Sequence, residues 1–242
     1  DIPLLPISCC MSRYQPDLKT LELAERYFER VELPEHIHDP VLLHGLYTIG
    51  SVGSIAQTQS SDMDLWVCYD AEDMPESMVA GLAYKLEYIE QWAMDAFGLE
   101  VHFFLMDLNL IRNNNFGFSD SESSGSAQAL LLKEEFYRTA MHVSGELPLW
   151  CVTEPGRRLF ESPESEQLLQ KFGEISEFVD LGGLRSIPRE EFFGASLWQI
   201  VKALKSPFKS IMKFGLLEKY ISAGDGEEGE GQNVRDSSSE KA

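Results

Sequence analysis

Two aspartates with a single residue between them, Asp62 and Asp64, are the residues in this chain best suited to chemistry. They stand where an apolar segment begins, and successive side chains of a strand point to opposite faces. The two carboxylates would therefore share one face, about 7 Å apart, while Met63 and Leu65 occupy the other, buried face. Two carboxylates placed in this way are costly unless a positive charge lies beside them. Mg²⁺, which carboxylates and substrate phosphates hold together, is the usual partner, so the pair predicts a metal site that handles phosphates.

Two glycine–serine pairs, Gly50-Ser51 and Gly53-Ser54, precede the aspartates. Ten residues separate Ser51 from the first aspartate. Glycine has no Cβ, so backbone N–H groups in such a turn can approach a phosphate closely. Each motif alone is weak evidence, but their combination at this spacing favours a phosphate-binding turn next to the carboxylates.

The elements that must position these groups follow from local patterns. The aspartates enter a strand expected over 63–69, and a second strand is expected over 99–106. Between them, residues 78–97 have the apolar spacing of a long amphipathic helix, and Gly98 is its expected C-cap. A strand, a helix and a strand in succession predict an α/β sheet unit, in which Glu100 lies on the face of its strand opposite to its apolar neighbours.

Other segments predict further helices and one short strand. Helices are expected over 17–31 with Asp17 as N-cap, over 128–143, 164–172 and 194–205, and after Ser206-Pro207, and a strand over 147–152. Residues 111–127 are polar and glycine-rich, which is typical of a mobile loop, either a lid over a nucleotide or a surface connection. Residues 1–15 are expected to be irregular. We therefore expect a catalytic domain over 1–152, a helical domain over 153–222 and a disordered acidic tail over 223–242.

The charge balance is strongly negative. Among 242 residues there are 20 basic and 40 acidic side chains, which give a net charge of −20. A field of this sign argues against nonspecific binding to nucleic acid or to an anionic membrane. No apolar run approaches the roughly 18 residues of a membrane span, and the four cysteines lack C-x-x-C spacing, so reduced thiols in a cytoplasmic protein are expected.

The main basic concentration lies between residues 201 and 219. It consists of Lys202, Lys205, Lys209, Lys213 and Lys219. Lys209 and Lys213 are four residues apart and would share one helix face. Any one of these lysines is most simply a solvated side chain, but the cluster as a whole is a candidate for contacting phosphate.

The glycine–serine turn, its spacing and the D-x-D strand together resemble the DNA polymerase β-type nucleotidyltransferase superfamily. This resemblance implies an α+β fold with a mixed sheet and helices, followed by a helical domain that completes the nucleotide site. It also implies a third carboxylate on a neighbouring strand. Glu100, flanked by Leu99 and Val101, matches that position, and Asp107 at the end of the same strand is the fallback.

Longer motifs extend the resemblance to the catalytic part of the class I adenylate cyclases of the enterobacterial type. In order, the matching segments are GSVGSIAQTQSSDMDLWVC, LEVHFFLMD, LLKEEFYRTA, VDLGGL and GASLWQIVKALKSPFKSIMK, within residues 40–222. The family implies conversion of ATP to 3′,5′-cyclic AMP and pyrophosphate by attack of the ribose 3′-hydroxyl on the α-phosphate. Residues before 40 match poorly. The family's large C-terminal regulatory region is not matched, so a regulatory region or partner protein is expected outside this chain.

Carried onto this chain, the resemblance implies a role for each matching residue. Gly50, Ser51 and Ser54 would contact phosphate, Asp62, Asp64 and Glu100 would hold two Mg²⁺ ions (or Mn²⁺), and Lys202, Lys209 or Lys213 would meet the triphosphate. Two alternatives stay open: another nucleotidyltransferase that moves AMP to a protein or small molecule, and a catalytically silent nucleotide-sensing module. A third, in which the D-x-D only caps a turn or strand, is purely structural.

Overall fold

The computed structural model describes most of the chain. The residues described are 10–27, 41–54, 57–59, 61–115, 126–152, 171, 175–183, 189–204, 207–208, 210–211, 213–215, 217–218 and 221. The chain divides into two compact units. Unit 1 comprises residues 1–117 and 134–183, and unit 2 comprises residues 118–133 and 184–242.

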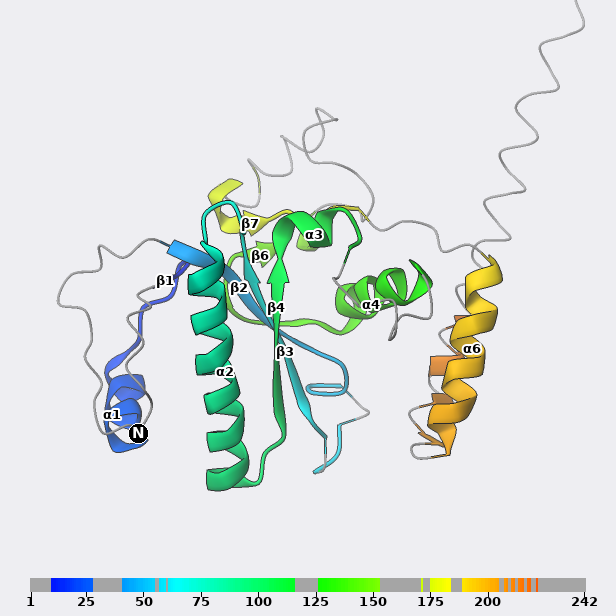
Figure 1. The fold of residues 1–242 in the computed structure, drawn as a ribbon, viewed down its shortest axis with the longest axis horizontal. Coiled ribbons are helices and arrows are strands. Elements are labelled where there is room, and N and C mark those ends of the chain that lie inside the picture. Colours follow the sequence, from blue (N-terminus) through cyan, green and yellow to red (C-terminus); the bar gives the residue numbers. More distant parts are fainter. Residues whose placement is uncertain are drawn as a thin grey trace, which may run out of the picture. The chain divides into compact units, whose positions relative to one another are not determined.

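Unit 1 is built on a mixed sheet of five strands, the type of sheet that the resemblance implies (Figure 1). Its strands are β1 (Cys10–Met11), β2 (Val41–Ile49), β3 (Met63–Tyr69), β4 (Val101–Asp107) and β5 (Met141–Gly145), of which β1, β2 and β5 were not predicted. The order is β1-β2-β3-β4, and β5 also pairs with β2. β2 runs antiparallel to β3 and β5, whereas β3 and β4 are parallel. The sheet with its helices confirms the expected α+β class.

One face of the sheet is covered by α2 (Glu76–Phe97), the crossover helix between β3 and β4. The helix ends at Gly98, whose φ of 63° is the left-handed conformation that glycine adopts at helix C-caps. Ala93 packs with Leu65 and Val101 in one core cluster, and Leu82 packs in a second cluster that includes the next inward residue of β3. The alternation predicted for β3 is therefore confirmed.

The opposite face of the sheet is covered by the C-terminal part of α4 (Ser126–Thr139), of which residues 134–139 belong to unit 1. Phe136 is fully buried and stacks on Trp66 with ring centroids 4.3 Å apart. The same ring meets Tyr47 edge-on at 5.4 Å. Since Trp66 follows Asp64 by two residues on β3, the aspartates belong to this face and not to the face under α2.

The N-terminal helix α1 (Leu18–Tyr27) forms where the apolar spacing predicts it. The side chain of Asp17 accepts a hydrogen bond from the backbone N–H of Thr20 at 2.7 Å, which confirms its capping role. Residues 28–31 of the expected helix lie outside the described residues. Residues 10–11 form β1 beside β2 rather than irregular structure, because the parallel pairing supplies backbone partners.

Two boundaries near α4 differ from the prediction. The helix expected over 128–143 ends at Thr139, and the next residues form β5 because they pair with β2. The strand expected over 147–152 is only the short β6 (Leu147–Pro148), which pairs with β7 (Phe178–Val179) and is followed by a 3-10 helix, η1 (Leu149–Cys151).

A short helix, α3 (Leu108–Arg112), follows β4 directly, and a 3-10 helix, η2 (Ile175–Glu177), precedes β7. Most of the expected 111–127 loop, most of the 164–172 helix and the whole 223–242 tail lie outside the described residues.

In unit 2 the described secondary structure is helical. It includes α6 (Arg189–Ala203) and helical residues between 207 and 221, which agrees with the expected helices there. No helix among the described residues combines the length and apolar character needed to cross a bilayer. The domain limits expected from the sequence stay a prediction.

Candidate active site

The candidate active site begins with carboxylates that β3 and β4 carry side by side. Met63 pairs with Val101 in the parallel register, and the N–H of Met63 donates to the carbonyl of Glu100 at 2.9 Å. The preceding residues, Asp62 and Glu100, therefore lie at neighbouring positions, on strands about 4.8 Å apart. Asp64 pairs with His102 one step further along. Asp64 and His102 thus share one face of the sheet, and Asp62 and Glu100 lie directly before the two strands, because β4 begins at Val101 and not at the predicted residue 99.

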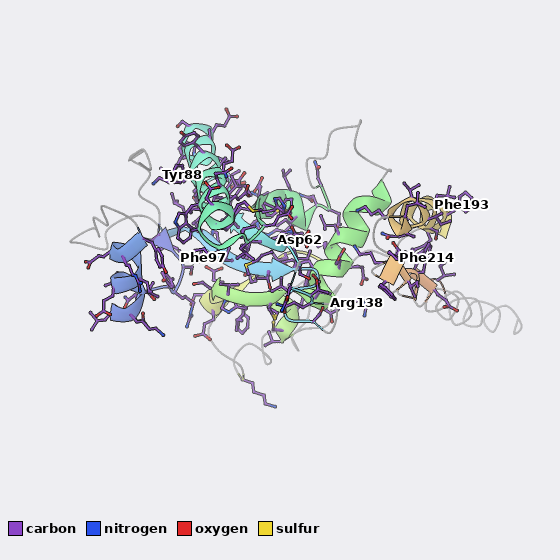
Figure 2. The ribbon with its side chains drawn as sticks, turned by 90° about the horizontal axis from the view of Figure 1, so that it is seen from below. Asp62, Tyr88, Phe97, Arg138, Phe193 and Phe214 are labelled. Carbon is purple, nitrogen blue, oxygen red and sulfur yellow. The ribbon has the colours of Figure 1, made fainter. Side chains whose placement is uncertain are left out.

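Figure 2 shows where this face lies. Asp62 is at the sheet, apart from Tyr88 and Phe97 of α2. Both aspartates are half-buried, whereas the side chain of Glu100 is 60% exposed. The three acids are therefore accessible to solvent and do not form part of the core under α2.

The carboxylate of Glu100 contacts an imidazole. Its Oε1 lies 3.2 Å from Nε2 of His102, and the imidazole is 45% exposed. Within the part of the chain that the structure describes, no three His, Cys, Asp or Glu side chains converge as a metal centre. The pairing of β3 with β4 brings the three predicted acids to the same end of the two strands, and their role as metal ligands stays a prediction. The oxygen donors fit a hard divalent cation in type.

The glycine–serine segment forms a tight turn, here called the Gly50 turn (residues 50–54), directly after β2. Gly50 has a φ of 92°, a conformation that residues with a Cβ avoid. A Cβ built on Gly50 would lie 3.8 Å from Oδ2 of Asp64, so the turn lies against the carboxylate face. Within the turn, both the backbone N–H and the hydroxyl of Ser54 donate to the carbonyl of Ser51, at 3.0 and 2.7 Å.

The hydroxyl of Ser51 is in a position typical of a group that binds a ligand. Its Oγ is buried and has no hydrogen-bond partner among the described residues. Buried hydroxyls normally find a partner, and an unsatisfied one calls for an explanation such as an absent ligand or water. The predicted phosphate contact of Ser51 would supply that partner.

One contact of the Gly50 turn was missed by the sequence analysis. The N–H of Gly50 donates to Oγ1 of Thr139, the last residue of α4, at 3.2 Å. This N–H is therefore already hydrogen-bonded. A phosphate could still contact Gly50, because glycine has no Cβ and lets the phosphate approach the backbone closely. Nothing in the local pattern around Thr139 indicates the contact, because the two residues are 89 positions apart.

The fallback third acid, Asp107, has a structural role at the other end of β4. Its side chain caps α3 by accepting from the N–H of Asn109 at 3.0 Å, and it also accepts from the N–H of Ala71 at 3.4 Å. It lies seven positions after Glu100, which corresponds to roughly 23 Å of extended strand. The geometry therefore favours Glu100 as the third acid.

The predicted lysines belong to unit 2. Lys202 is exposed on α6, and Lys213 is half-buried among the helical residues that follow. Lys209 lies outside the described residues. Their contact with a triphosphate stays a prediction.

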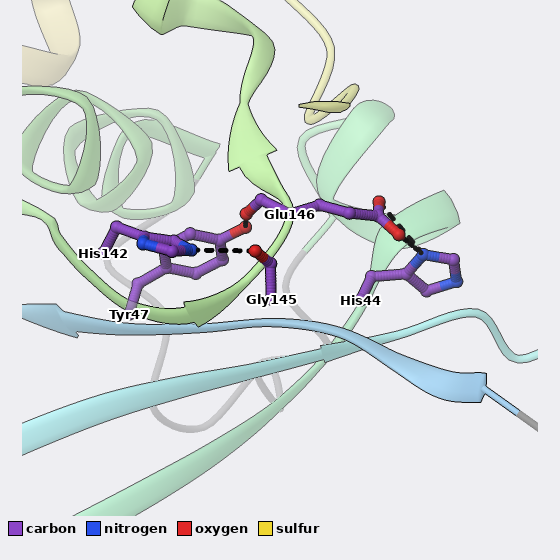
Figure 3. A network of polar contacts seen from close by, with 5 residues as sticks. All are labelled: His44, Tyr47, His142, Gly145 and Glu146. Carbon is purple, nitrogen blue, oxygen red and sulfur yellow. Dashed lines mark hydrogen bonds and ion pairs between the residues drawn. The ribbon is translucent and has the colours of Figure 1, made fainter. Parts of the chain in front are cut away.

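A part-buried polar network connects the middle of β2 to Glu146, directly after β5 (Figure 3). Nδ1 of His44 lies 3.2 Å from Oε1 of Glu146, and the hydroxyl of Tyr47 donates to the backbone carbonyl of Glu146. The hydrogen bond to Glu146 raises the pKa of His44, against the opposing effect of burial, and the charge of the same carboxylate adds to the rise. Burial raises the pKa of Tyr47, so its hydroxyl stays protonated as a donor.

Comparison with known proteins gives two family matches. Residues 5–151 match the model of the adenylate cyclase NT domain, and residues 187–224 match the model of the class-I adenylate cyclase second domain. The first match covers more than half of the chain.

Curated relatives agree with these matches. An adenylate cyclase of Escherichia coli K12 is 38% identical over 225 residues, which cover 89% of this chain and 25% of the relative. The adenylate cyclase of Proteus mirabilis is 41% identical over 73% of this chain and 20% of its own length. That of Yersinia intermedia is 36% identical over 82% of this chain and 24% of its own length. The chain spans a quarter or less of these relatives.

A solved toxin–antitoxin with AMP-PNP aligns over 82% of this chain at 15% identity, and its TM-score of 0.26 is too low to indicate a shared fold.

Proposed function

Because this chain belongs to the class I adenylate cyclase family, we propose that it contains the catalytic part of an adenylate cyclase, which converts ATP to 3′,5′-cyclic AMP and pyrophosphate. The observation that carries the proposal is that three acids lie together: Asp64 lies on β3 against the Gly50 turn, and Asp62 and Glu100 come directly before β3 and β4 at neighbouring positions. A binding site for a nucleoside triphosphate needs two parts: a turn that phosphate groups can approach, and carboxylates that hold the metal counter-ions of the triphosphate.

The phosphate-binding role is assigned to the Gly50 turn. The unpartnered Oγ of Ser51 would donate to a phosphate oxygen, and the glycine next to it leaves space for that approach. The hydroxyl of Ser54 donates to a carbonyl within the turn, so its phosphate contact requires it to exchange that partner. Lys202, Lys209 or Lys213 would neutralise the rest of the triphosphate charge.

The three acids would hold Mg²⁺, with Mn²⁺ as an alternative. When bound, a pair of such ions would lower the pKa of the ribose 3′-hydroxyl and stabilise the charge on the leaving pyrophosphate. Asp62 and Asp64 are half-buried beside the turn, which suits them to fixed positions, whereas the exposed side chain of Glu100 can leave His102 for a ligand. The net charge of −20 makes this local neutralisation necessary for any anionic substrate.

The test is product analysis with ATP as the sole nucleotide. Purified protein is incubated with ATP and Mg²⁺, and the products are resolved by chromatography. Cyclic AMP and pyrophosphate support the proposal. AMP attached to an added protein or small-molecule acceptor, without cyclic AMP, would indicate another nucleotidyltransferase. ATP binding without any product would contradict catalysis by this chain on its own, and it would indicate a missing activator, another acceptor or the silent sensing module, in that order.

A further inference from the structure

Thr139 connects the end of α4 to the Gly50 turn through a single hydroxyl. Its Oγ1 donates to the carbonyl of Glu135, one helical turn earlier, at 2.7 Å. A hydroxyl has one hydrogen and further lone pairs, so the same oxygen is left as the acceptor for the N–H of Gly50 at 3.2 Å. The back-bond to the helix also holds the β-branched side chain in one rotamer.

The segment that follows Thr139 also contacts Gly53, the second glycine of the turn. A Cβ on Gly53 would collide with Sδ of Met141, so the methionine lies directly against that residue. Met141 begins β5 and pairs with Thr48 of β2, two residues before the turn begins. The junction between α4 and β5 is therefore fixed to the strand that leads into the turn, and it contacts the turn at both glycines.

These contacts have a role that the bonds within the turn cannot fill. The hydrogen bonds between Ser51 and Ser54 shape the turn, but both partners move with it. The bond to Thr139 ties the turn to an outside element, and α4 is itself anchored where Phe136 stacks on Trp66. The pairing of Ile49 with Asp64 fixes where the turn begins, and the bond to Thr139 connects the turn itself to α4.

We infer that Thr139 is a positioning residue for the phosphate turn: its hydroxyl orients Gly50 and Ser51 so that the buried Ser51 Oγ meets the triphosphate beside the carboxylates. The inference rests on the proposed function. Thr139 touches no reacting atom in this account and acts only through the turn. A substrate that lacks phosphates should not depend on it.

Two substitutions separate the hydroxyl from the shape of the side chain. Thr139→Val keeps the branched shape and removes the acceptor, whereas Thr139→Ser keeps the hydroxyl and removes a methyl group. A net hydrogen bond of about 0.5–1.5 kcal/mol corresponds to about a 2- to 13-fold change. We expect Thr139→Val to speed amide hydrogen exchange at Gly50 by this factor and to weaken ATP binding by a similar factor, with adenosine affinity unchanged. Thr139→Ser should restore both values.

The exchange rate at Gly50 and the two affinities each test a different part of the inference. Unchanged exchange at Gly50 in Thr139→Val would mean that the hydroxyl does not hold the turn. Faster exchange with an unchanged ratio of ATP to adenosine affinity would overturn the functional role. Equal loss of both affinities together with a lower melting temperature would indicate a merely structural residue. If the unsubstituted protein neither binds ATP nor forms cyclic AMP, the proposed function fails and the inference fails with it, while the Gly50 exchange rates show whether the hydrogen bond itself exists.

Discussion

Phe136→Ala should destabilise unit 1 more than the loss of any half-exposed ring. The side chain is 0% exposed and stacks on Trp66 at 4.3 Å with an interplanar angle of 20°. Removing a buried phenylalanine costs about 3–5 kcal/mol, of which about 0.5–1.5 is the aromatic pair. For a protein of this size each kcal/mol shifts the melting temperature by about 2–4 °C, so a decrease of about 6–20 °C is expected.

The matched control is Phe97→Ala at the end of α2. This ring is 56% exposed and meets Trp92 and Tyr27 only edge-on, at 5.2 and 5.8 Å. Its loss should cost about 1–2 kcal/mol. Thermal unfolding followed by near-ultraviolet circular dichroism reports on the tryptophans directly. If Phe136→Ala does not fold, Phe136→Leu keeps most of the volume, and a loss of about 1–2 kcal/mol is expected. Shifts for Phe136→Ala no larger than those for Phe97→Ala would refute the packing of α4 on the sheet.

Two further predictions concern the carboxylates and the buried histidine. Glu100→Gln should reduce cyclic AMP formation far more than Asp107→Asn, because asparagine caps a helix about as well as aspartate and keeps the α3 cap in place; the opposite ranking in rate assays would move the third acid to Asp107. The pKa of His44 is raised in the folded state above its ordinary value of 6.5, so its bond to Glu146 stabilises the fold fully below pH 6.5 and this contribution is lost as pH rises through the raised pKa. Urea unfolding should therefore show the advantage of the unsubstituted protein over His44→Gln shrinking above pH 6.5, and a constant difference would contradict the assignment.

Local patterns were sufficient for β3 and for the helix that covers it. The alternation in β3, the 22-residue helix α2 and the cap at Gly98 each depend on residues close in sequence, and all three formed as predicted. The shared face of Asp62 and Asp64 follows from the same alternation. Their proximity to Glu100 required the further assumption that β3 and β4 are parallel neighbours, which the crossover helix makes the expected arrangement.

Long-range contacts explain what the sequence did not reveal. Residues 141–143 continue a helical apolar pattern, yet they belong to β5 because β2, almost 100 positions earlier, offers backbone groups for pairing. The bond from Gly50 to Thr139 spans 89 positions and leaves no trace in local spacing. Asp107 is an acid beside an apolar strand, as a metal ligand would be, and only the start of α3 identifies it as a cap. The sequence alone could not separate these roles because they depend on what pairs with each segment.

The rate of cyclic AMP formation in aspartate variants tests the central claim most directly. Asp62→Asn and Asp64→Asn are compared with Asp95→Asn, whose side chain is exposed on α2 and accepts from Gln91 at 2.8 Å. Loss of a group that only supports a metal ligand costs about 10- to 100-fold, so removing a ligand itself should cost at least about 100-fold. We expect that loss in both site variants, with unchanged melting temperatures and with Asp95→Asn at full rate. Equal rates in all three variants, or a collapsed fold in Asp62→Asn and Asp64→Asn, would contradict it.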